Sequence, residues 1–178
     1  MKTLLKRYRF FIITIIVTII IILFNRNIGM KALDISTYSL KEMALVIPPI
    51  FVLLGLLDIW VPRETMIKYM GENSGIKGIV LSIILGSAAA GPLYGAFPVA
   101  AVFMKKGVKF SNILIFIGAW STTKIPMFLF ELSALGRKFA VTRLLIDIPV
   151  IIFIAFILNS TISKDKKDEI YRKAENIV

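Results

Sequence analysis

The sequence predicts an all-α, polytopic membrane protein with about four spanning helices, broken or re-entrant helical segments and a short amphipathic surface helix. The chain of 178 residues is 57% hydrophobic, and its mean hydropathy of +0.83 is too apolar for an ordinary soluble domain. Its lysines and arginines, which give a net charge of +11, gather between the apolar runs and at the ends. Two of the apolar runs are interrupted near their middle by small residues, polar residues and proline.

The first apolar run, residues 10–24, follows a basic start and resembles a secretory signal. No small-residue cleavage motif follows it, so we expect an uncleaved first spanning helix. A polar connector is expected over 31–42 and a second span over 43–61.

Residues 62–77 mix charges with methionine, isoleucine and tyrosine. This mixture is typical of a short amphipathic helix that lies on the membrane, begins at Pro62 and ends at Gly71.

The last part of the membrane region is a short basic loop that includes Arg143, followed by a final span over 144–158. We interpret residues 1–163 as one membrane permease unit. Residues 164–178 are expected to form a charged cytoplasmic tail.

The stretch 78–131 holds the two interrupted segments, with breaks expected within 86–92 and within 120–126. Proline removes a helical hydrogen bond, and non-helical backbone at membrane depth must be shielded by protein or a watery cavity. Two interrupted segments in succession favour a binding site in a transporter. The alternative interpretation is a pair of kinked, tightly packed helices.

The distribution of positive charge predicts the topology, because cytoplasmic loops carry an excess of lysine and arginine. With a cytoplasmic N-terminus, the bias is largest when only the first broken segment is re-entrant. That arrangement gives four crossings and places the loop 105–109 and the tail on the cytoplasmic side. A topology with two re-entrant segments and three crossings gives a slightly smaller bias and stays open.

The first break offers Gly91, Pro92 and Tyr94 as candidate binding residues. We expect Gly91 to end one half-helix and Pro92 to begin the next, whose free N–H groups would favour an anion. Tyr94 would supply a hydroxyl. Alternatively, Gly91 and Gly95 form a G-x-x-x-G pattern that serves only close helix packing.

The second break offers Ser121, Thr122, Thr123 and Lys124. Serine and threonine cap helices, so a half-helix is expected to start at Thr122 or Thr123. Lys124 would then pair with Glu131, seven residues on, or contribute to a site for an anionic substrate. A third possibility is that Lys124 extends to the membrane interface.

Composition limits the chemistry of the chain, because it contains neither cysteine nor histidine. Disulfides, thiolate chemistry, the commonest general base and the commonest transition-metal ligand are therefore absent. We expect no enzymatic activity, no catalytic residue, no metal site and no cofactor. The positive charges fit topology signals and contact with membrane lipid, and we expect no nucleic acid partner.

The segments GSAAAGPLYGAFPVAAVFMKKG and GAWSTTKIPMFLFE resemble a family of predicted permeases related to the organoarsenical exporter ArsP and to YraQ. The resemblance runs over about 44–149 and implies an integral membrane permease. Larger members are similar to two such units fused, which implies that this chain matches one half. Arsenical-exporting members have cysteines where this chain has PLYGAFP at 92–98, so the resemblance does not imply a substrate.

We therefore expect a multi-pass permease subunit in the cytoplasmic membrane that moves a small solute, for which an anion is a candidate. Its site would be formed by residues 86–98 and 118–126, and a second copy of the chain would complete the assembly, most simply as a homodimer. The alternative is a non-transporting membrane subunit that assembles with a partner protein. The candidate binding residues are Gly91, Pro92, Tyr94, Ser121, Thr122, Thr123, Lys124 and Glu131.

Overall fold

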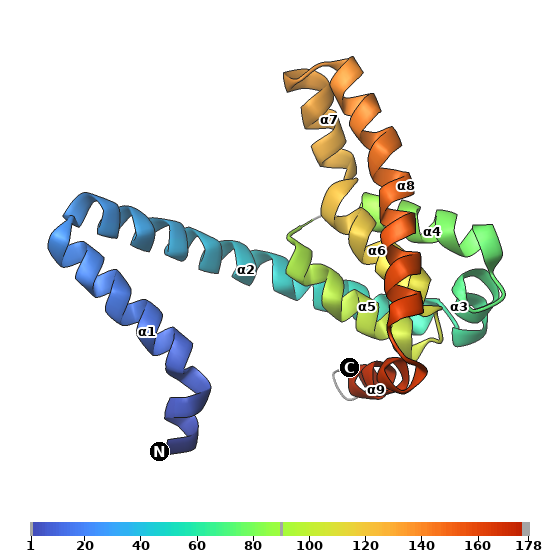
Figure 1. Cartoon of the computed structure of the whole chain (residues 1–178), viewed down its shortest axis with the longest axis horizontal. Coiled ribbons are helices and arrows are strands. Elements are labelled where there is room, and N and C mark those ends of the chain that lie inside the picture. Colours follow the sequence, from blue (N-terminus) through green and yellow to red (C-terminus); the bar gives the residue numbers. More distant parts are fainter. Residues whose placement is uncertain (1, 90, 176–178) are drawn as a thin grey trace. The chain divides into compact units, whose positions relative to one another are not determined.

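The computed structural model, drawn in Figure 1, describes the backbone of residues 2–89 and 91–175 and their side chains except those of 2–7, 51, 53, 54, 57, 58 and 175. In these residues the regular structure is helical, with no strand, so the all-α prediction is confirmed. The chain divides into two compact units, Met1–Pro48 and Pro49–Val178.

The first unit holds α1 (Lys2–Phe24) and the beginning of α2 (Arg26–Trp60). The two helices are separated at Asn25, whose side-chain oxygen accepts the backbone N–H of Ile28 at 3.3 Å and so caps α2. Apolar side chains such as Phe10 are exposed all around the described part of α1. A helix that is apolar on every side is suited to a hydrocarbon environment.

The expected connector over 31–42 is wrong, because this stretch is helical and continues α2. It contains no glycine or proline, and its lysine, alanine, leucine and glutamate residues favour a helix even though the stretch is polar.

The second unit contains α3 (Arg63–Met70), which confirms the short helix expected between Pro62 and Gly71. Met66 and Met70 are buried in the main hydrophobic cluster, whereas Ile67 and Tyr69 are exposed. One side of α3 therefore packs in the protein interior. That α3 lies on a membrane surface stays a prediction.

The first interrupted segment comprises α4 (Gly75–Ala88), the 3-10 turn η1 (Leu93–Gly95) and α5 (Ala96–Lys105). Beyond it the chain returns to the end of α3, just before α4. The backbone N–H of Lys109 donates to the carbonyl of Met70 at 2.9 Å.

The buried side chain of Asn112 strengthens this return. Its amide nitrogen donates to the Met70 carbonyl at 2.8 Å and to the Ser74 hydroxyl at 3.1 Å. A buried amide with satisfied donors fixes the two ends of the interrupted segment against each other.

The second interrupted segment comprises α6 (Phe110–Thr122) and α7 (Ile125–Ala134), and the chain then turns into α8 (Arg137–Thr161) and α9 (Lys164–Glu175). Figure 1 shows α7 and α8 side by side.

The expected loop through Arg143 is wrong, since α8 already begins at Arg137. Gly136, with φ of +87°, makes the turn, and no glycine or proline follows until Pro149. Arg143 therefore lies inside the apolar helix.

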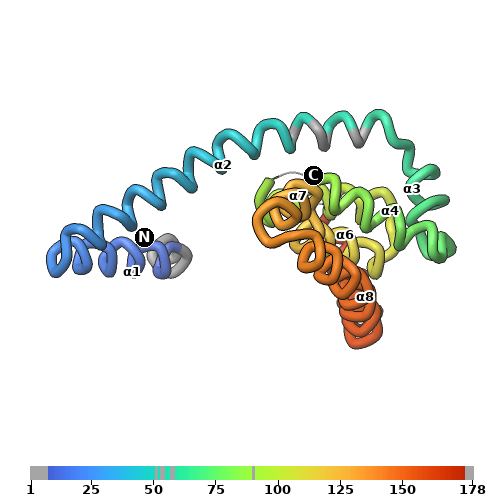
Figure 2. Tube along the Cα trace, turned by 90° about the horizontal axis from the view of Figure 1, so that it is seen from above, coloured from blue at the N-terminus to red at the C-terminus, as the bar shows by residue number. Residues whose placement is uncertain are grey.

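Helix α6 lies between α4 and α8, as Figures 1 and 2 show. Glycines permit both contacts. A Cβ atom on Gly86 of α4 would come within 2.5 Å of the Phe116 carbonyl oxygen, and one on Gly118 would come within 2.8 Å of Ile151. Close helix packing at small residues therefore occurs at Gly86 and Gly118.

Two stretches of the described chain are long and apolar enough to cross a membrane, Phe110–Ala134 and Arg137–Thr161. This is fewer than the four spans expected. The other apolar stretches, Tyr8–Phe24, Gly75–Ala88 and Leu93–Lys105, are shorter.

Candidate functional site at the two helix breaks

The two breaks meet at the carbonyl oxygen of Gly91. The ammonium group of Lys124 donates a short hydrogen bond to this oxygen. The indole nitrogen of Trp120 lies 3.4 Å from the same oxygen. The structure thus places Lys124 of the second break at the first break, and one backbone acceptor joins residues far apart in sequence.

The first break has an extended backbone whose geometry depends on glycine. Helix α4 ends at Ala88, and Ala89 is extended with φ of −69° and ψ of 140°. Gly91 has φ of +100°, which side chains disfavour. Ala90, which lies within the predicted break, is outside the described residues.

The prediction that Pro92 begins the next half-helix is wrong. Pro92 is extended, with ψ of 160°, and the α-helical geometry begins only at Ala96, after η1. The Pro92 carbonyl accepts the first hydrogen bond of η1, from the Gly95 N–H at 3.0 Å, so Pro92 is the cap of this 3-10 turn, and Gly91 lies in the connection after α4.

The predicted start of the second half-helix is also wrong. Helix α6 continues through Ser121 and Thr122, and α7 begins at Ile125 with Lys124 at its N-cap position. The Thr122 and Thr123 hydroxyls donate to carbonyls four residues earlier, at 3.0 Å and 3.1 Å. They therefore complete the last turn of α6 instead of capping α7.

A hydroxyl pair adds a second link between the breaks, since the Ser87 and Thr123 oxygens lie 2.8 Å apart. Ser121 is exposed at the end of α6. Tyr94 is half-buried in η1, and in the described part of the chain its hydroxyl takes no part in the hydrogen bonds that join the breaks.

Arg143 forms a charged cluster beside the second break. Its guanidinium contacts the Glu131 carboxylate directly, lies 3.4 Å from the Asp147 carboxylate and donates to the Thr122 carbonyl at 2.9 Å. Glu131 is buried, with 5% of its surface exposed. A cation at the C-terminal end of α6 satisfies a carbonyl that the interrupted helix leaves free.

The predicted pairing of Lys124 with Glu131 is wrong, because Glu131 pairs with Arg143. Lys124 has an extended backbone, with ψ of 134°, so the helical spacing that places residues seven apart on one face does not start from it. Arg143 reaches Glu131 from the neighbouring helix.

Three residues of this arrangement were not among the candidates: Ser87, Trp120 and Arg143. The Arg143–Asp147 spacing of four in an apolar run was a sequence signal for an ion pair inside a helix. Ser87 and Trp120 carried no comparable signal, because their partners lie on a distant segment.

The two cations near the breaks, Arg143 and Lys124, differ in how many carboxylates they contact. Arg143 is shared by two carboxylates, Glu131 and Asp147. Within the described residues, Lys124 makes its hydrogen bond to a neutral carbonyl and has no carboxylate in salt-bridge contact. The meeting point of the breaks therefore combines an ammonium group, an indole N–H and hydroxyls, and it can attract negative charge.

The exposed faces and the interrupted helices together define the class of protein. Large apolar side chains on α7 and α8, Phe130 and Phe153 among them, are exposed, while charges gather at the breaks. This distribution is suited to a membrane environment. Residues 28–177 match the family ArsP_1, described as predicted permease, and the chain belongs to this family. Neither a curated protein nor a solved structure matches the chain.

Membership supports a transporter role, and it confirms the family expected from the resemblance. It also favours a transporter over an enzyme.

Proposed function

We propose that the chain is a permease subunit of the cytoplasmic membrane that moves a small anionic solute through a site formed by residues 86–98 and 118–126. The observation that carries this proposal is the position of Lys124. Its ammonium group lies where the two breaks meet and hydrogen-bonds to a carbonyl, while the nearby carboxylates engage Arg143. Lys124 is half-buried, and a partly desolvated positive charge without a carboxylate beside it favours an anionic ligand.

Helix lengths support a topology in which the first interrupted segment is re-entrant. The 14 residues of α4 and the 10 of α5 rise about 21 Å and about 15 Å, too little to cross a hydrocarbon core of about 30 Å. The two ends of the segment are joined by the hydrogen bond between Lys109 and Met70. We infer that the chain enters and leaves on one side.

The second interrupted segment has the length of a full crossing. Its 25 residues, Phe110–Ala134, rise about 38 Å if helical throughout, and α8 has the length to return. Since α4 and α6 have similar lengths, both breaks lie at a similar depth. Together with one span from α1 and one from α2, this arrangement gives four crossings.

A homodimer is the simplest assembly that would enclose a path for the solute. One chain offers two interrupted segments, and transporters commonly place paired interrupted helices from two repeats near the membrane midplane. The alternative, a non-transporting subunit that needs a different partner protein, predicts no transport by the purified chain alone.

The test is uptake into proteoliposomes that contain the purified chain. Radiolabelled inorganic phosphate, sulfate and acetate serve as probes, and protein-free liposomes give the background. We expect saturable uptake of at least one anion. Lys124→Ala should abolish it, and Lys124→Arg should restore part of it if charge alone matters.

The matched control is Lys138→Ala, which removes an exposed lysine near the start of α8. It should transport like the wild type. Full activity of Lys124→Ala, or background rates for all three anions, would contradict an anion site at the breaks. Transport by a chain shown to be monomeric by subunit counting in the same vesicles would contradict the homo-oligomer.

A further inference from the structure

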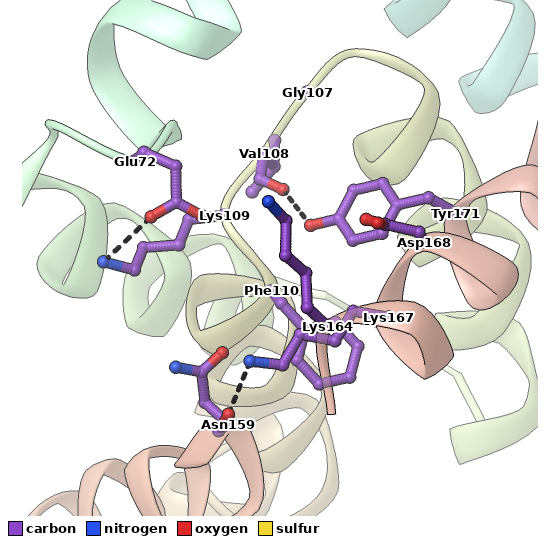
Figure 3. A pocket seen from close by; sticks show the side chains of 10 residues that line it. All are labelled: Glu72, Gly107, Val108, Lys109, Phe110, Asn159, Lys164, Lys167, Asp168 and Tyr171. Carbon is purple, nitrogen blue, oxygen red and sulfur yellow. Dashed lines mark hydrogen bonds and ion pairs between the residues drawn. The ribbon is translucent and has the colours of Figure 1, made fainter. Parts of the chain in front are cut away.

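A cavity of about 450 Å³ lies away from the breaks, between the loop that follows α5, the end of α8 and the first turns of α9 (Figure 3). Three lysines line it, Lys109, Lys164 and Lys167, together with two carboxylates, Glu72 and Asp168. The lining charges thus have a positive excess.

The lysines differ in what they contact. Lys109 pairs with Glu72 at 3.2 Å, and the carboxylate side of this pair is 76% exposed. Lys167 donates to the carbonyl of Asn159 at 2.5 Å and lies over the Phe110 ring, 5.9 Å from its centre. Both ammonium groups are therefore held in place by the protein.

Lys164 is free to serve a ligand. Its side chain extends into the cavity (Figure 3), and no hydrogen bond or ion pair within the described residues engages it. It lies at the start of α9, where the N-terminal backbone adds positive potential.

The walls of the cavity are fixed by the tail helix. The Tyr171 hydroxyl donates to the Val108 carbonyl at 2.6 Å, and its ring packs against Phe110 with centres 6.4 Å apart. Burial, and to a smaller extent the Glu72 carboxylate, raise the pKa of Tyr171. The site is therefore present before any ligand binds.

We propose that this cavity binds a phosphate group, supplied either by the headgroup of an anionic phospholipid or by free phosphate. Lysine ammonium groups bind phosphate as point charges, and three of them surround one space. The cavity adjoins the last turn of α8, where a spanning helix reaches the headgroup layer. Basic pockets at this depth are suited to anionic headgroups. The proposal does not depend on transport.

The experiment measures binding to the purified full chain in mild detergent. Native mass spectrometry and thermal unfolding are recorded during titration with phosphatidylglycerol, phosphatidylcholine and, separately, inorganic phosphate. We expect phosphatidylglycerol to bind and to raise the unfolding temperature, with phosphatidylcholine at least about fivefold weaker.

Lys164→Ala should weaken binding about fivefold without altering the ligand-free unfolding temperature, because this side chain supports no other contact. The matched control is Lys166→Ala, which removes the same charge from the same exposed turn but does not line the cavity. It should bind like the wild type.

Glu72→Gln should tighten binding severalfold, because it removes a competing carboxylate from Lys109. A gain of affinity cannot arise from misfolding, so this variant separates a ligand site from general destabilisation.

Phosphatidylglycerol binding that depends on Lys164 assigns the site to a lipid headgroup. Binding of inorganic phosphate alone, with the same dependence, assigns it to free phosphate. Equal binding of both lipids without any effect of inorganic phosphate, or equal losses in Lys164→Ala and Lys166→Ala, would overturn the proposal.

Discussion

Removal of the Arg143 side chain should destabilise the fold far more than removal of Lys124. In Arg143→Ala, the Glu131 carboxylate keeps its buried position, with 5% of the residue exposed, but loses the guanidinium beside it. The Thr122 carbonyl also loses its donor at 2.9 Å. Orphaning one member of a buried ion pair costs about 3–5 kcal/mol.

Lys124→Ala should cost about 2 kcal/mol, the usual contribution of one hydrogen bond from a charged donor. The Gly91 carbonyl still lies 3.4 Å from the Trp120 indole nitrogen, so it does not lose every donor. No carboxylate is orphaned by this change, because Glu131 remains with Arg143.

The assay is reversible unfolding in mixtures of mild detergent and sodium dodecyl sulfate, followed by circular dichroism. Double-mutant cycles compare two pairs. The double variant Arg143→Ala/Glu131→Gln should lose at least about 2 kcal/mol less unfolding free energy than the sum of the two single losses. For Lys124→Ala/Glu131→Gln, the loss should equal the sum of the single losses within about 0.5 kcal/mol. Strong coupling of Lys124 to Glu131, with none for Arg143, would refute the assignment of the ion pair.

Three further predictions concern the architecture. Gly86→Leu should prevent folding or cost several kcal/mol, because a Cβ atom there comes within 2.5 Å of the Phe116 carbonyl oxygen; normal yield and stability of this variant would show that α4 and α6 are not in contact. Gly91→Ala should cost about 1–2 kcal/mol, because its φ of +100° disfavours a side chain, and an unchanged unfolding curve would contradict that backbone conformation. Single cysteines at the exposed positions Lys105 and Leu135 should react with impermeant reagents from opposite sides of the membrane, since α6 and α7 separate them; labelling from the same side would contradict a crossing.

The sequence alone was sufficient for the class of fold and for the position of the two breaks. Long apolar runs, charges confined to short stretches, and proline with small residues inside two runs are local properties. These local properties determine where backbone hydrogen bonds are interrupted and which segments are stable in hydrocarbon. Neither effect depends on which distant segment packs against them. The short helix between Pro62 and Gly71 was predicted for the same reason.

Local rules failed where an alternative structure was also locally acceptable. The stretch 31–42 is polar, so we predicted a connector. It contains no helix breaker, and its residues have sufficient helix propensity to continue α2. The seven-residue spacing from Lys124 to Glu131 assumed one continuous helix, and the extended backbone at Lys124 removes that assumption.

The partners of the charges were decided by tertiary structure alone. Glu131 has several cations near it in the sequence, and it is the antiparallel packing of α8 on α7 that brings Arg143 to it. Because Glu131 is paired with Arg143, Lys124 instead donates a hydrogen bond to the Gly91 carbonyl, more than thirty residues away in the sequence. Ion pairing depends on distances between side chains of different helices, and these distances follow from how small residues such as Gly86 and Gly118 let the helices approach.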